Sequence, residues 1–107
     1  MTKCEFFRDH ERITGFSISG HSGYAEAGQD IVCAAVSAAV AMAETTINDV
    51  CGGKAKVRVK EADARITLTL PAACEEEDAI QAVLAGLMLY LINLRDDYED
   101  YIEVLEV

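Results

Sequence analysis

Tryptophan is absent from this 107-residue sequence, proline occurs once, and aromatic residues make up only 7%. A single proline and seven glycines exclude the proline- and glycine-rich composition of disordered chains. Basic residues are also scarce: nine Lys and Arg stand against nineteen Asp and Glu, which gives a formal net charge of −10. Because such a chain repels phosphate backbones, we expect no general nucleic-acid binding and a preference for basic partners.

Closely spaced metal-ligand pairs are missing as well. The four cysteines, Cys4, Cys33, Cys51 and Cys74, include no Cys-x-x-Cys pair, and a structural zinc site needs such short spacings. We therefore predict no metal and no cofactor. The N-terminus has no long apolar stretch of the kind found in secretion signals, which predicts a cytoplasmic protein without disulfides.

The sequence also lacks long uninterrupted hydrophobic runs. The longest, Ala79 to Leu94, is interrupted by Gln81 and Asn93, and it is shorter than the about 20 residues that a membrane-spanning helix needs. We interpret it as a buried helix and expect no membrane association.

Hydrophobic residues as a whole are abundant, at 51%, which is enough for the core of one domain over residues 1–107. Alternating patterns predict strands, and periodic stretches rich in Ala, Val and Leu predict helices. Their order predicts an α+β fold, a single sheet with ββαββαβ order and two helices packed on it. The predicted strands span residues 2–9, 12–20, 55–60, 65–70 and 101–107, and the helices span 31–49 and about 75–95.

The same patterns predict which side chains point inward. In the second strand, Phe16 and Ile18 share one face and Ile13 lies on the other, while Val57 and Val59 of the third strand point toward the core. The helix over 31–49 is apolar on most sides. We expect it to be buried on most sides, against the sheet and against a second helix or a partner subunit.

The stretch Gly20–Ser37 joins the end of a predicted strand to the start of a predicted helix. His21 lies at the strand end, whereas His10 lies in a polar turn at the opposite end of the sheet. Asp30 is suited to cap the helix, which makes Cys33 its third residue. Free N–H groups at a helix start and a nearby imidazole both stabilise a thiolate, so the pattern predicts that Cys33 is a nucleophile and His21 its base.

Further residues of this stretch have candidate roles. The N–H groups of Cys33 and Ala34 are candidates for binding an oxyanion, because they point out of the helix start. The glycine-flanked loop, with Ser22, Gly23 and Gly28, is a candidate gate for substrate entry. Asp30 is placed to hold an imidazolium, and Ser37 lies four residues after Cys33 on the same helix face.

Two runs of this stretch resemble the signature of the ribosomal-processing cysteine protease Prp family of bacteria. They are Gly20-His21-Ser22-Gly23 and, after the loop, Gly28-Gln29-Asp30-Ile31-Val32-Cys33-Ala34-Ala35-Val36-Ser37. The length and the ββαββαβ order fit the family along the whole chain.

The resemblance implies a cysteine endopeptidase that removes the short N-terminal extension of large-subunit ribosomal protein twenty-seven, the substrate partner. It implies that His21 and Cys33 are catalytic, that Asp30 and Ser37 assist, and that the protein is a homodimer.

Two other functions stay open at this point. One is a non-catalytic dimeric ribosome-associated binding module of the same fold. The other is a thiol redox protein, which is disfavoured because no resolving cysteine lies near Cys33 in sequence. The remaining three cysteines are most simply packing residues.

Overall fold

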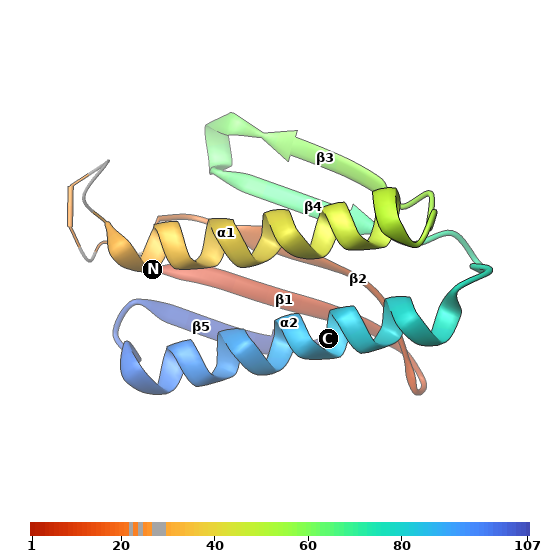
Figure 1. Ribbon diagram of the computed structural model, residues 1–107. Helices are drawn as coiled ribbons and strands as arrows, with labels where there is room; N and C mark the ends of the chain where they lie inside the picture. The colour runs from red at the N-terminus through yellow and green to blue at the C-terminus, as the bar shows by residue number, and fades with distance from the viewer. Residues whose placement is uncertain (22, 24, 27–29) are drawn as a thin grey trace.

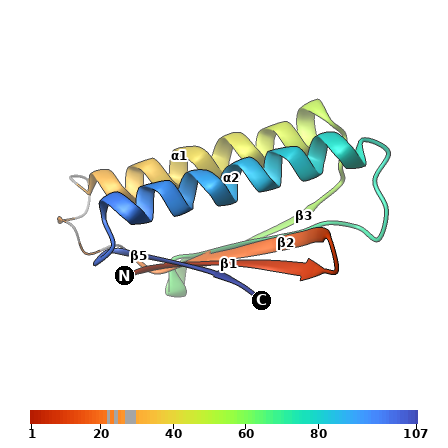
Figure 2. The same cartoon turned by 90° about the horizontal axis from the view of Figure 1, so that it is seen from below.

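A five-stranded sheet carries both long helices on one of its faces (Figures 1 and 2). The computed structural model describes residues 1–21, 23, 25–26 and 30–107. The predicted α+β fold and the ββαββαβ order are confirmed. The strands are β1 (Thr2–Asp9), β2 (Arg12–Ser19), β3 (Lys56–Lys60), β4 (Arg65–Thr69) and β5 (Ile102–Glu106), and the helices are α1 (Ile31–Thr45) and α2 (Glu77–Asp97). A π-helical turn over Thr46–Val50 extends α1, and a 3-10 turn over Glu61–Asp63 joins β3 to β4.

The strands lie in the order β3-β4-β2-β1-β5. Strand β5 pairs in parallel with β1, and the other neighbours are antiparallel. In the β1–β2 hairpin, Lys3 pairs with Ser19 at one end and Asp9 with Arg12 at the other. The residues that follow β2 therefore leave the sheet at the end opposite the hairpin turn that holds His10, as expected.

A β-bulge in the first hairpin changes one of the predicted faces. Phe7 pairs with Gly15 but Arg8 pairs with Ile13, so Thr14 is an extra residue in β2. Because the extra residue shifts the alternation by one position, Ile13 is buried on the same side as Phe16. The prediction that Ile13 faces away from the core is wrong for this reason.

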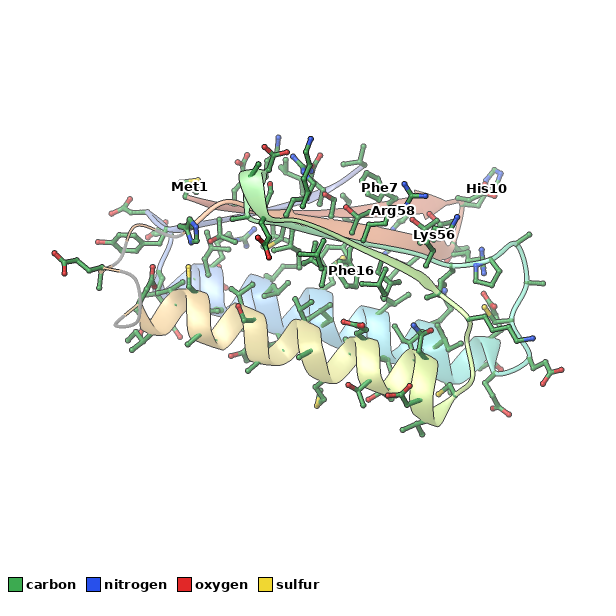
Figure 3. The ribbon with its side chains drawn as sticks, turned by 90° about the horizontal axis from the view of Figure 1, so that it is seen from above. Met1, Phe7, His10, Phe16, Lys56 and Arg58 are labelled. Carbon is green, nitrogen blue, oxygen red and sulfur yellow. The ribbon has the colours of Figure 1, made fainter. Side chains whose placement is uncertain are left out.

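Close packing between β2 and β4 requires a glycine at position 15. A Cβ atom on Gly15 would lie 2.2 Å from the carbonyl oxygen of Leu68, far inside van der Waals contact. On the helix-facing side of the sheet, the rings of Phe6 in β1 and Phe16 in β2 pack at 5.9 Å between centroids. Figure 3 shows Phe16 between the sheet and the helices.

The two helices contribute the other half of the core. In α1 the apolar stripe Val32, Val36, Val40 and Ala43 is buried, and in α2 Ile80, Leu84, Leu87, Met88 and Leu91 are buried. The opposite face of α1 remains exposed, with Met42 at 67%. The expectation that α1 is buried on most sides therefore does not hold within one chain, because α2 covers only one flank of it.

Both helical segments, Ile31–Val50 with 20 residues and Glu77–Asp97 with 21, have the length and the apolar composition of membrane-crossing helices. The second helix is therefore longer than the apolar run Ala79 to Leu94 from which it was predicted. Length and composition are weak evidence for a span, since core helices pass the same test. Here each helix packs its buried stripe against the sheet.

The start of α2 is anchored to the first hairpin. The Arg12 guanidinium pairs with the Glu77 carboxylate and donates to the Pro71 carbonyl at 2.8 Å. The Gln81 amide bonds both backbone groups of Ile13, at 2.8 Å each. The hydrogen bond from Arg12 holds the pKa of Glu77 below its usual value, although desolvation opposes it.

The β3–β4 hairpin differs from its prediction at one position. Val57 is half-buried against the core, but Val59 is 69% exposed. The prediction that Val59 points into the core is therefore wrong. It lines a cleft, described below, in which most of its side chain stays exposed.

Candidate active site

The start of α1 is fixed by Asp30. Its carboxylate oxygen Oδ1 accepts hydrogen bonds from the backbone N–H groups of Val32 and Cys33, at 3.0 Å each. This confirms the predicted N-cap and makes Cys33 the third helical residue. The thiol is half-buried in the first turn, where the helix dipole favours a negative charge.

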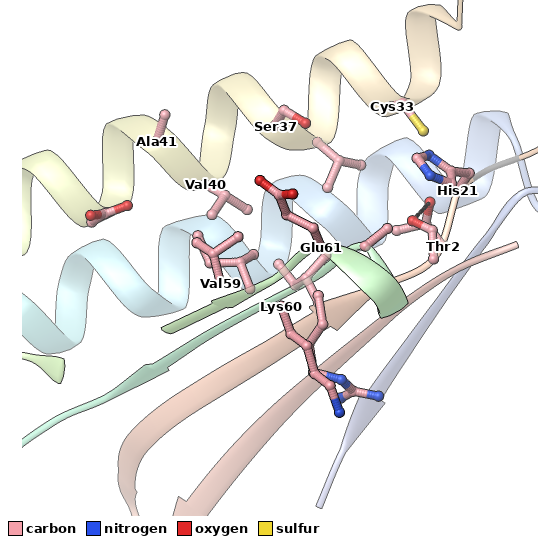
Figure 4. Close-up of a pocket in the computed structure, with 16 residues that line it drawn as sticks. Thr2, His21, Cys33, Ser37, Val40, Ala41, Val59, Lys60 and Glu61 are labelled. Carbon is pink, nitrogen blue, oxygen red and sulfur yellow. Dashed lines mark hydrogen bonds between the residues drawn. The ribbon is translucent and has the colours of Figure 1, made fainter. Parts of the chain in front are cut away.

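His21 follows the end of β2 after a single residue, Gly20. Gly20 has a φ of +83°, which a residue with a side chain rarely adopts, and its N–H donates to the carbonyl groups of Asp63 and Ala64 at 3.3 and 3.2 Å. The buried Thr2 hydroxyl donates to the Gly20 carbonyl at 3.5 Å. These contacts turn the chain out of the sheet, so that the His21 imidazole lies below the start of α1. Figure 4 shows the Cys33 thiol directed toward that ring.

The pair lies in a cleft between α1 and the β3–β4 hairpin, which we call the main cleft. Its volume is about 430 Å³. One wall is the face of α1 from Cys33 to Glu44, and the other is formed by Val59, Glu61 and Ile66. A cleft of this size holds a few side chains of an extended peptide, and the thiol lies in its lining.

A second hollow, of about 500 Å³, adjoins the main cleft at the pair. Its lining includes Gly23, Ala25 and Asp30, and it shares His21 and Cys33 with the main cleft. The thiol and the imidazole therefore lie where two hollows meet. A chain bound across both hollows would have its middle against the thiol.

The backbone donors at the helix start are arranged differently from the expectation. The N–H of Cys33 donates to the Asp30 carboxylate, and the N–H of Ala34 donates to the Asp30 carbonyl at 3.0 Å. Neither N–H points freely at the cleft, because the capping carboxylate and the first helical hydrogen bond use them. An oxyanion can reach the Cys33 N–H only by displacing the cap.

The other predicted site residues are placed as follows. Ser37 lines both hollows, one turn along α1 from Cys33. Asp30 lines the second hollow and caps the helix. Its contact with an imidazolium stays a prediction. Gly23 has a φ of +77° and open space around its Cα. Ser22 and Gly28 of the predicted gate loop lie outside the described residues.

The lining residues that the sequence prediction missed include Thr2, Glu44 and Glu61. Glu44 and Glu61 come from opposite walls of the main cleft, and no spacing in the sequence brings them together. Thr2 had a weak signal, because it precedes Cys4 and Phe6 on the buried face of β1. Its burial as a polar residue was visible only in three dimensions.

The remaining cysteines are packing residues, as predicted. Cys4 is in the core, and burial raises its pKa to about 12. Cys51 and Cys74 pack against the core from its edge. Within the described part of the chain, no group of three His, Cys, Asp or Glu side chains is placed to hold a metal ion.

Cys33 and His21 both line the main cleft and the second hollow, and a thiol and an imidazole are the two side chains that a cysteine-dependent hydrolase uses. A family model described as cysteine protease Prp matches residues 1–103, and the chain belongs to this family of cysteine peptidases.

Individual relatives match this chain along nearly its whole length. The ribosomal processing cysteine protease Prp of Bacillus subtilis (strain 168) is 28% identical over 107 residues, which cover 97% of this chain and 96% of the relative. The essential ribosomal processing protease Prp of S. aureus, solved with a covalently linked product peptide, has a TM-score of 0.90 at 19% identity, with both chains fully covered. SMU.848 of Streptococcus mutans has a TM-score of 0.88 at 21% identity, covering all of this chain and 94% of the other.

Proposed function

We propose that this protein is a cysteine endopeptidase that removes the short N-terminal extension of large-subunit ribosomal protein twenty-seven during bacterial ribosome maturation. Cys33 is the nucleophile and His21 is its general base and acid. The observation that carries the proposal is the position of Cys33, on the capped first turn of α1 with its thiol directed toward the His21 imidazole, where two hollows meet.

Four further observations support it. The chain belongs to the cysteine protease Prp family, and the Bacillus subtilis relative is named a ribosomal processing protease. The S. aureus protein of the same fold has been solved with a substrate peptide and with a covalently linked product peptide. The formal charge of −10 also suits a basic ribosomal substrate.

The reaction follows from the two side chains and water. The imidazole takes the thiol proton, and the thiolate attacks the scissile carbonyl carbon. The tetrahedral intermediate collapses to a thioester as the imidazolium gives its proton to the leaving amine. A water molecule, deprotonated by the imidazole, then hydrolyses the thioester, which releases the acid product and restores the thiol.

The outer face of the helices supports a homodimer as the working form. A groove of about 650 Å³ runs between α1 and α2 on the surface away from the sheet, and Met42 and Tyr90 line it. These two side chains are 67% and 43% exposed, so each leaves apolar surface that a partner could cover. A second copy that packs on this groove would bury the face of α1 that one chain leaves open.

The substrate also sets the compartment. A protein that processes a newly made ribosomal protein works in the bacterial cytoplasm, and we propose this location.

Sedimentation of the wild-type protein and of Met42→Glu tests the dimer. The wild-type protein should sediment as a dimer and the variant as a monomer. A wild-type monomer would contradict the proposed dimer.

The experiment for the activity uses a peptide that spans the extension and the first residues of the mature ribosomal protein. Mass spectrometry should find a single cut at the junction with the wild-type protein, and no cut with Cys33→Ala or His21→Ala. Undiminished cleavage by Cys33→Ala would exclude the mechanism. A peptide that binds but stays intact with the wild-type protein would favour the non-catalytic binding module.

A further inference from the structure

The main cleft extends well beyond the thiol. Cys33, Ser37, Val40 and Glu44 line it from α1, and their spacing places them on one face of the helix. Because an α-helix rises 1.5 Å per residue, Val40 lies about 10 Å and Glu44 about 16 Å along α1 from Cys33. An extended peptide advances about 3.3 Å per residue, so these positions correspond to about the third and the fifth residue from the scissile bond.

The floor of this extension is apolar. Val36 and Val40 of α1, with Val59 and Ile66 of the hairpin, line it. Val59 is 69% exposed although it lies on the helix-facing side of the sheet. An apolar side chain of a bound peptide would remove this surface from water, at about 25 cal/mol for each Å².

The charges around the cleft are not balanced within it. Its two basic side chains are held elsewhere: Lys60 pairs with Asp63 at 3.3 Å, and Arg65 donates to the Ser17 hydroxyl at 2.6 Å. Its two carboxylates, Glu44 and Glu61, form no ion pair with any residue that the structure describes.

The direction of one carboxylate matters for a bound peptide. Figure 4 shows Glu61 pointing from the hairpin toward α1, at the level between Ser37 and Val40. Glu44 lies one turn beyond Val40 on the facing helix and is half-buried. Two carboxylates from opposite walls thus flank the path of a peptide whose backbone would be partly removed from water, where charges interact more strongly.

We propose that the main cleft selects a peptide with a Lys or Arg three to five residues from the scissile bond, next to an apolar side chain that packs on Val40 and Val59. Glu44 and Glu61 are the residues that determine this specificity. The position relative to the scissile bond rests on the proposed function, whereas the preference of the cleft for a basic peptide can be measured without catalysis.

The test measures peptide binding to Cys33→Ala, which cannot cleave. Fluorescence anisotropy compares peptides spanning the ribosomal extension that carry Lys, Gln or Glu in turn at the second to sixth position on each side of the junction. On one side, Lys at the third to fifth position should bind about fivefold more tightly than Gln, and Glu more weakly than Gln. The preference should shrink at high salt, because the peptide remains partly exposed.

Charge-neutral variants in the same background assign the effect. Glu44→Gln and Glu61→Gln should each reduce the Lys-over-Gln ratio about twofold, as expected for a partly exposed ion pair. Glu75→Gln is the matched control, since it removes the same charge from an exposed position outside the cleft. Equal binding of Lys and Gln peptides, an equal effect of Glu75→Gln, or no binding of any peptide would overturn the proposal.

Cleavage by the wild-type protein separates this proposal from the proposed function. Cleavage without any charge preference would overturn the selectivity and leave the protease. A charge preference in binding, without cleavage of any peptide, would overturn the protease and leave the selectivity of the cleft.

Discussion

Removal of the Asp30 side chain should destabilise the protein measurably, because this carboxylate holds two N–H groups of the helix that carries Cys33. Both hydrogen bonds are 3.0 Å long and partly buried. Loss of an N-cap side chain costs about 1 kcal/mol, and up to about 2 in folded proteins. For Asp30→Ala we therefore expect the free energy of unfolding to fall by about 1 to 2 kcal/mol. The melting temperature of a domain of this size should drop by about 4 to 8 °C for each kcal/mol.

Asp30→Asn is the matched control, because Asn caps helices about as well as Asp but lacks the charge. It should lose less than half of what Asp30→Ala loses, and that remainder reports the interaction of the charge with the helix dipole. Urea unfolding followed by circular dichroism measures all three proteins. If Asp30→Ala is as stable as the wild type, or if both variants lose the same amount, the two hydrogen bonds do not hold the helix start as described.

Three other predictions follow from the packing of Gly15, the lowered pKa of Glu77 and the position of Cys33 at the helix start. Gly15→Ala should lower the free energy of unfolding by about 1 to 3 kcal/mol, because its Cβ would meet a β4 carbonyl oxygen at 2.2 Å. The control is Gly86→Ala in α2, where a Cβ meets nothing within 4 Å. In the same urea titration this control should not lower the free energy of unfolding. The Arg12 hydrogen bond lowers the pKa of Glu77 from 4.5. The stabilisation that the Glu77 carboxylate contributes is therefore complete above pH 4.5 and is lost as the pH falls through the lower folded-state pKa. The stability difference between wild type and Glu77→Gln should shrink between pH 6 and about pH 3, and a constant difference would contradict this. Cys33 should react with iodoacetamide at pH 6 to 7 ahead of the other three cysteines, and mass spectrometry showing similar rates at all four would refute its activation.

The alternation of apolar residues was sufficient to predict the order of the elements. A period of two identified the strands, and a period near 3.6 identified both helices. It failed at Ile13 because one extra residue, Thr14, shifts the register of β2, and a bulge leaves no mark in a hydrophobic pattern. It failed at Val59 because burial depends on what lies opposite, and the facing part of α1 leaves a cleft there.

The helix start was predictable in one respect and not in another. An aspartate just before an apolar helix indicated the N-cap, and the cap fixed Cys33 as the third helical residue. The prediction of free N–H groups at Cys33 and Ala34 did not follow from it, because the cap and the helix use the same donors. The local sequence pattern identifies which backbone N–H groups lie at a helix start. Which acceptor each N–H group binds is decided by the three-dimensional geometry.

The sequence could not predict that two carboxylates, Glu44 and Glu61, line the main cleft. Glu44 belongs to α1 and Glu61 to the turn between β3 and β4, and the sheet and the helix must pack before the two face one cleft. Net charge predicted a preference for basic partners but gave no position for it.

The pairing of Cys33 with His21 is tested most directly by the kcat/KM values of Cys33→Ala, His21→Ala and the double variant on the ribosomal extension peptide. Groups that act as a unit lose activity together, so each single variant should fall by at least about a thousandfold and the double variant no further. Losses that multiply in the double variant, or substantial cleavage by either single variant, would contradict a catalytic pair at this site.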